Sequence, residues 1–151
     1  MAFSIIVVLY VTIGFLAAAG SMCISKKLFS VKAEQIFFAL FLIAIAGFYL
    51  AFTAYFEDQN AWPFEAEGVI VFVIFGLVGI RVPVLLIIGY LLHGVWDVLH
   101  EIHAHGGRDL FGVQVTEFPL AYGAFCAAYD WCMAGYFYTR RSDWRAAWVE
   151  H

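Results

Sequence analysis

Charged side chains are scarce in this sequence. Only 13% of its 151 residues are Asp, Glu, Lys or Arg, 64% are hydrophobic, and the mean hydropathy is +0.87. Soluble domains carry about 25% charged residues, and a chain this short could not bury so much apolar surface within a core of its own. The composition therefore excludes an ordinary soluble domain and indicates that lipid is the solvent for most of the chain.

Cysteine is rare, and basic clusters are missing. The three cysteines, Cys23, Cys126 and Cys132, are odd in number and form no C-x-x-C pair, which argues against a disulfide framework or a zinc knuckle. The 8 basic residues form no stripe, so we expect no nucleic-acid partner. A chain of this length predicts a single integral membrane domain over residues 1–151.

Most of the sequence consists of long apolar runs. A helix over residues 68–104 would be roughly 55 Å long against a hydrocarbon core of about 30 Å, so Pro83 is expected to break it. Pro119 stands in the same relation to the last run, with Thr116 as the expected N-cap. We therefore predict an all-α polytopic membrane protein, a bundle of five transmembrane helices. Their spans are about 4–22, 34–55, 64–80, 82–104 and 118–139.

The basic residues also predict an orientation. With the N-terminus outside, the cytoplasmic segments hold every Lys and Arg except Arg108. Since cytoplasmic loops are enriched in Lys and Arg, we predict an external N-terminus and a cytoplasmic C-terminus. Lys26 and Lys27 follow the first apolar run, which favours an uncleaved span over a signal peptide.

Ionisable residues in the last two expected spans are the candidate functional residues, because such groups are costly inside a bilayer. On a helix, the side chains of His93, Asp97 and His100 fall within roughly 60° of one another. Asp130 in the next span is expected at a depth similar to that of His93, because the two helices run antiparallel. Two imidazoles and two carboxylates at one depth predict a metal site, with His93, Asp97, His100 and Asp130 as ligands.

Such nitrogen and oxygen ligands suit zinc first, although iron or manganese would accept the same set. A divalent cation lowers the pKa of a coordinated water to about 7 and generates a nucleophile for hydrolysis. Glu101 and Glu117, near the outer mouth, would then serve as catalytic proton shuttles. This first hypothesis describes a metal-dependent hydrolase that acts on a lipid-like substrate among membrane lipids.

A second hypothesis needs no metal and no catalysis. A His–Asp pair that faces another Asp can form a hydrogen-bonded network between two helices, at about 0.6 kcal/mol for each bond. The protein would then be a small carrier, a proton pathway or an accessory membrane subunit. Both hypotheses leave open whether His103 and His105 take part, and whether the chain forms a homo-oligomer or joins a larger membrane complex.

The pattern H-x-x-W-D-x-x-H, from His93 to His100, precedes a C-x-x-x-D pattern formed by Cys126 and Asp130. These two patterns resemble those of an uncharacterised family of small multi-pass bacterial membrane proteins, a domain of unknown function. The resemblance is good over about the last 60 residues and rests on hydropathy alone in the first half. It implies that Trp96 and Cys126 share the site with the predicted ligands, in a bacterial inner (plasma) membrane. It implies no reaction, because none is assigned to the family.

Overall fold

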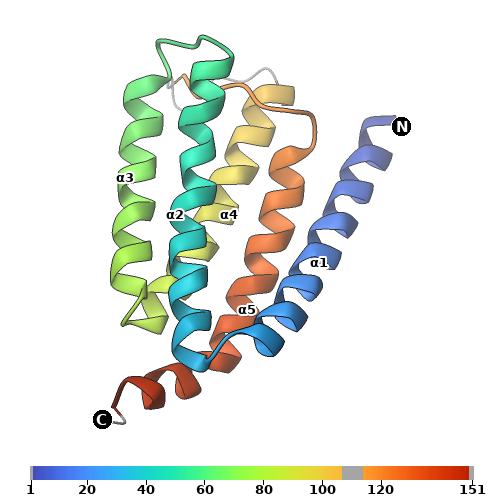
Figure 1. Cartoon of the computed structure of the whole chain (residues 1–151). Coiled ribbons are helices and arrows are strands. Elements are labelled where there is room, and N and C mark those ends of the chain that lie inside the picture. The colour runs from blue at the N-terminus through green and yellow to red at the C-terminus, as the bar shows by residue number, and fades with distance from the viewer. Residues whose placement is uncertain (1, 107–113, 150–151) are drawn as a thin grey trace.

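The computed structural model describes residues 2–106 and 114–149, and within these ranges all regular secondary structure is α-helix. Consecutive helices alternate in direction, and the two ends of the chain lie at opposite ends of the molecule (Figure 1). The prediction of an all-α protein with five helices is confirmed for the described part of the chain. The helices are α1 (Ala2–Leu28), α2 (Val31–Tyr55), α3 (Trp62–Gly79), α4 (Pro83–Gly106) and α5 (Tyr122–Val149).

Four of these helices, α1 to α4, are long and apolar enough to cross a membrane. Large apolar side chains are exposed on them, such as Leu16, which is 67% exposed, and Ile70, which is 59% exposed. Water-soluble proteins rarely leave wide apolar surfaces uncovered, so these surfaces indicate an integral membrane protein. Helix α5 is not among the candidate spans, so the fifth crossing and the orientation remain predictions.

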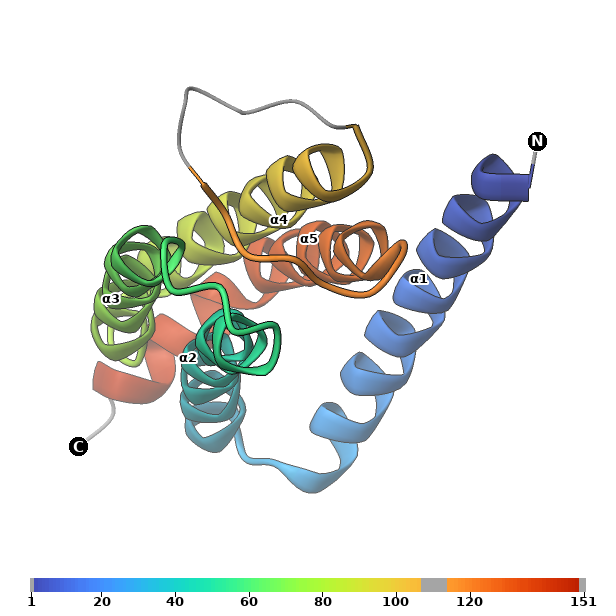
Figure 2. The same ribbon diagram turned by 90° about the horizontal axis from the view of Figure 1, so that it is seen from above.

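Helix α5 nevertheless contacts three other helices of the bundle, α1, α2 and α4. It packs against α4 on one side and α1 on the other, while α1 diverges from α2 and stands at the edge (Figure 2). Gly14 of α1 makes close packing on α5 feasible, because a Cβ there would lie 2.4 Å from the carbonyl oxygen of Phe125. Small residues at helix contacts are a typical way to bring membrane helices together.

The break between the third and fourth helices falls where proline predicted it. Helix α3 ends at Gly79 and α4 begins at Pro83, since proline is accommodated in the first turn of a helix but not in its interior. The apolar stretch from 68 to 104 is therefore divided into two antiparallel helices that lie side by side in both views (Figures 1 and 2).

The predicted start of the fifth helix was wrong. Helix α5 begins at Tyr122 and not near residue 118, and Pro119 lies before the helix, where its carbonyl accepts the Tyr122 N–H at 3.1 Å. The Thr116 hydroxyl donates to the carbonyl of Glu117 at 3.3 Å and caps no helix. The chain enters the helix through Ala121, whose φ of 61° places it in the left-handed region, a conformation that costs a non-glycine residue about 1 kcal/mol.

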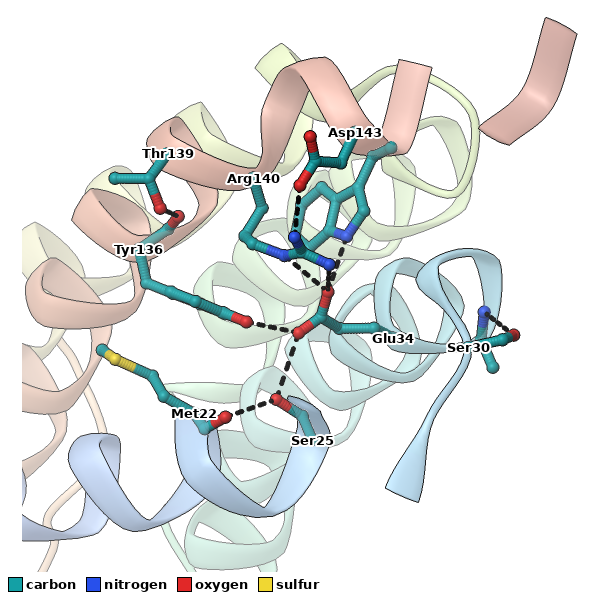
Figure 3. A network of polar contacts seen from close by, with 10 residues as sticks. Met22, Ser25, Ser30, Glu34, Tyr136, Thr139, Arg140 and Asp143 are labelled. Carbon is teal, nitrogen blue, oxygen red and sulfur yellow. Dashed lines mark hydrogen bonds and ion pairs between the residues drawn. The ribbon is translucent and has the colours of Figure 1, made fainter. Parts of the chain in front are cut away.

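A buried carboxylate joins three helices at the end of the bundle opposite to the N-terminus (Figure 3). Glu34, in the first turn of α2, accepts hydrogen bonds from Ser25 Oγ at 3.2 Å, Trp144 Nε1 at 2.9 Å and Arg140 Nε at 3.0 Å. The Tyr136 hydroxyl also donates to it. These bonds fasten α1 and the last turns of α5 to α2, so the bundle is held by polar contacts as well as by packing.

Candidate metal centre

Three of the four predicted ligands come together between α4 and α5. His93 and Asp97 lie one turn apart on α4, so their side chains share a face. The His93 Nδ1 atom lies 2.7 Å from Asp130 Oδ2 of α5 and 3.2 Å from Asp97 Oδ2. One ligand atom from each of these residues lies within 4.8 Å of the other two. All three residues are at most 1% exposed, so the group is buried inside the bundle.

A close contact between the two helices allows this arrangement. Gly123, at the start of α5, packs directly on the backbone of α4, and a Cβ at this position would lie 2.4 Å from the carbonyl oxygen of Asp97. Two turns further along α5, Asp130 faces His93. The absence of a side chain at Gly123 therefore sets the distance between the helices that carry the group.

Helices α2 and α3 close the remaining sides of the group. The Tyr49 hydroxyl of α2 donates to Asp97 Oδ1, and this tyrosine is only 2% exposed. The Phe72 ring of α3 meets the His93 imidazole edge to face, with centroids 4.8 Å apart. The sequence analysis missed both residues. A tyrosine near the middle of an apolar span, away from the interface where tyrosine usually lies, was the available signal for Tyr49.

His100 is buried beside the group but bonds to other partners. Its Nδ1 lies 2.9 Å from the carbonyl oxygen of Trp96, and its Nε2 lies 2.8 Å from Glu65 Oε1. The same Glu65 oxygen accepts the backbone N–H of Thr116 at 2.8 Å. Glu65 lies in the first turn of α3 and is fully buried. The role of His100 as a ligand remains a prediction.

The two predicted proton shuttles lie in different surroundings. Glu101 accepts the backbone N–H groups of Ala121 and Gly123, each at 3.0 Å, and so caps the start of α5 in place of the expected threonine. Glu117 is exposed. His103 is half-buried near the end of α4, and the side chain of His105 lies outside the described residues. The catalytic roles of the two glutamates remain predictions.

Several buried atoms of the group have no hydrogen-bond partner among the described residues. They are His93 Nε2, Asp130 Oδ1 and Asp97 Oδ2, the last of which has only the 3.2 Å ion-pair contact with His93 Nδ1. Outside the group, Glu65 Oε2 is a fourth such atom. Buried polar atoms nearly always have a partner, which is an ordered water or a bound ion where no protein group supplies it. Two adjacent buried carboxylates also repel each other unless a positive charge compensates them. The group therefore has the composition, burial and unused ligand atoms needed to hold a cation.

The two residues that the resemblance added to the site border it. The Trp96 ring lies 6.4 Å from that of Tyr49 and 6.1 Å from that of Phe72, centroid to centroid, so it packs against the aromatic wall around His93. Cys126 lies one turn before Asp130, and both line one pocket between α2 and α5. Neither residue belongs to the group that could hold a metal.

Comparison with known proteins gives a family and no activity. No significant match is found among curated proteins or among solved structures. A family model described as a family of unknown function (DUF6010) matches residues 6–143. The match spans nearly the whole bundle and includes His93, Asp97 and Asp130. The chain is therefore a member of the DUF6010 family of unknown function.

Proposed function

We propose that this protein is an integral membrane protein that binds a divalent metal ion between α4 and α5. His93, Asp97 and Asp130 would be its ligands, with zinc as the first choice and iron or manganese as alternatives. The observation that carries this proposal is the set of buried ligand atoms that have no partner among the described residues. A dication would supply the missing contacts and would compensate the charge of two adjacent carboxylates.

We further propose that α5 crosses the membrane, with the N-terminus outside and the C-terminus in the cytoplasm. The low hydropathy of α5 does not oppose this, because Asp130 is fully buried among other helices and exposes no charge to lipid. Polar groups inside membrane proteins typically face the bundle interior in this way. The predicted location is the inner membrane of a bacterium.

A metal with three protein ligands keeps one position for water, as catalytic zinc sites do. Such a water has a lowered pKa and becomes a nucleophile near neutral pH. We propose hydrolysis of a lipid-like substrate as the reaction, because the group is buried within helices whose outer surfaces are apolar. In this proposal, Tyr49 orients Asp97 through its hydroxyl, which is the support that a metal-binding carboxylate usually receives.

Elemental analysis of detergent-purified protein tests the metal site. We expect about one zinc, iron or manganese per chain in the wild type, as for a single site of this type, and its loss in His93→Ala and in Asp130→Ala. Asp143→Ala is the matched control, because Asp143 is an exposed carboxylate on the same helix as Asp130. A folded wild type without stoichiometric metal would refute the proposal.

A second function is favoured by the direct contacts within the group. His93 Nδ1 is hydrogen-bonded to Asp130 Oδ2, and Tyr49 donates to Asp97, so part of the hydrogen-bonding capacity is satisfied without a cation. A polar network of this kind would suit a proton pathway, a small carrier or an accessory subunit, alone or in a larger complex. Under this alternative Asp130→Asn leaves the metal content unchanged. Proton flux into vesicles containing the purified protein would then depend on Asp130.

A further inference from the structure

A pocket of about 210 Å³ lies between α2 and α5 and reaches the candidate metal centre. From α2 it is lined by Phe41, Ile45 and Phe48, which are three or four residues apart and so share one helix face. From α5 it is lined by apolar and aromatic side chains and by Asp130. Among the described residues, the only carboxylate in this lining is therefore one of the proposed ligands.

Aromatic contacts between the two helices lie at either end of this pocket. Phe41 meets Tyr129 with ring centroids 6.0 Å apart, and Phe52 meets Tyr122 at 5.3 Å. The α2 side of the lining runs from Phe41 to Phe48, a rise of roughly 10 Å at 1.5 Å per residue. The rim is open to the outside of the bundle, because Phe48 is 49% exposed. Since α2 is a candidate membrane span, the pocket opens sideways, toward lipid.

We propose that this pocket binds one hydrocarbon chain of a membrane lipid and brings that lipid to Asp130 from the side. The inference rests on the proposed function, because it identifies how a lipid substrate would reach the metal centre. The pocket is smaller than the roughly 300–1,000 Å³ of drug-sized ligand sites, and a helix of a second protein is about 10–12 Å wide. A stretch of a single hydrocarbon chain suits these dimensions, whereas a whole lipid or a helix does not.

Asp130 in its lining distinguishes this pocket from a second one of similar size. That second pocket, of about 230 Å³, lies between α3 and α4 and is lined by Val71, Leu92 and other apolar or aromatic side chains, with no ionisable residue. A chain could occupy it as ordinary surrounding lipid, but it gives no contact with a ligand of the metal centre. It therefore serves as the matched control.

Photo-crosslinking in vesicles tests the inference. The purified protein is placed in phosphatidylcholine vesicles that contain a phosphatidylcholine with a diazirine in one acyl chain. After irradiation, mass spectrometry maps the labelled peptides, and elemental analysis measures metal in the same preparations. Ile45→Trp fills the pocket between α2 and α5, and Phe48→Trp at its exposed rim is the milder second variant. Val71→Trp fills the control pocket.

We expect label on segments 41–48 and 122–130 of the wild type, its loss in Ile45→Trp and Phe48→Trp, and its retention in Val71→Trp. Metal content should be equal in all folded variants. Unchanged labelling of both segments in either pocket variant overturns the inference, as does an equal loss in Val71→Trp. No label in the wild type, with a change of oligomeric size in Ile45→Trp, shows that a second copy covers the pocket and also overturns it.

Metal content separates the failure of this inference from the failure of the proposed function. If the wild type contains metal but the pocket variants do not change the labelling, the chain-binding pocket is refuted and the metal centre is not. If the wild type contains no metal but its labelling is lost in the two pocket variants alone, the pocket is supported and the metal centre is refuted.

Discussion

Replacing Gly123 with alanine tests whether the close approach of α4 and α5 creates the candidate metal centre. The new Cβ would lie 2.4 Å from the carbonyl oxygen of Asp97 and 3.1 Å from Cβ of Glu101. Ordinary contacts begin near 3.4 Å, so the helices must separate by about 1 Å to avoid this overlap. The carbonyl is backbone and cannot rotate away as a flexible side chain would.

The size of the effect follows from this separation. Overpacking of a close contact typically costs about 1–3 kcal/mol. The higher helix propensity of alanine, compared with glycine, offsets at most about 1 kcal/mol of this cost. We therefore expect Gly123→Ala to lower the free energy of unfolding by about 1–2 kcal/mol. The distance between His93 and Asp130, now 2.7 Å, would grow by up to about 1 Å and leave hydrogen-bonding range. Metal affinity should fall by about 10–100-fold, as when a supporting contact of a metal site is lost.

Unfolding in mixed detergent micelles measures the stability, and competition with a chelator measures the metal affinity. Gly135→Ala is the control on the same helix, because nothing lies within 4 Å of a Cβ built there. This control should keep its metal and lose no stability. If Gly123→Ala matched Gly135→Ala in both measurements, the close approach of the helices would not determine the site.

Three further substitutions probe the contacts around the bundle. Tyr49→Phe leaves the buried Asp97 Oδ1 without its donor, so we expect a loss of about 1–3 kcal/mol and metal affinity about 10–100-fold weaker by chelator competition. Glu101→Ala removes the acceptor of two N–H groups at the start of α5 and should destabilise the fold by about 1–2 kcal/mol in detergent unfolding. Glu34→Ala leaves the Arg140 guanidinium without its main partner and should lower stability by about 3 kcal/mol, with metal content unchanged.

Exposed carboxylates provide the controls for these variants. Glu117→Ala and Asp143→Ala remove side chains at the surface, where substitutions usually change stability by less than about 1 kcal/mol. A Glu101→Ala variant as stable as Glu117→Ala would contradict the capping role. Loss of metal in Glu34→Ala would show that the cluster in Figure 3 and the metal centre are not independent.

The sequence by itself determined the helices. A chain in lipid must satisfy its backbone hydrogen bonds within each segment, so the number of helices and the break at Pro83 follow from local hydropathy and proline. The shared face of His93 and Asp97 follows from helical periodicity for the same reason. The start of α5 could not be predicted from the local sequence, because it depends on Glu101, which lies twenty residues before Ala121 in the chain. A local cap could not reveal that contact.

Only the tertiary structure decided which side chains meet. The contacts of Tyr49 with Asp97, of Glu65 with His100, and of α2 with the pocket beside Asp130 join residues that are 35 or more positions apart in sequence. Such contacts depend on which helices are neighbours and how each is rotated about its axis. Hydropathy determines neither the neighbours of a helix nor its rotation, because lipid and protein interior are equally apolar. Close packing at small residues such as Gly123 determines both instead.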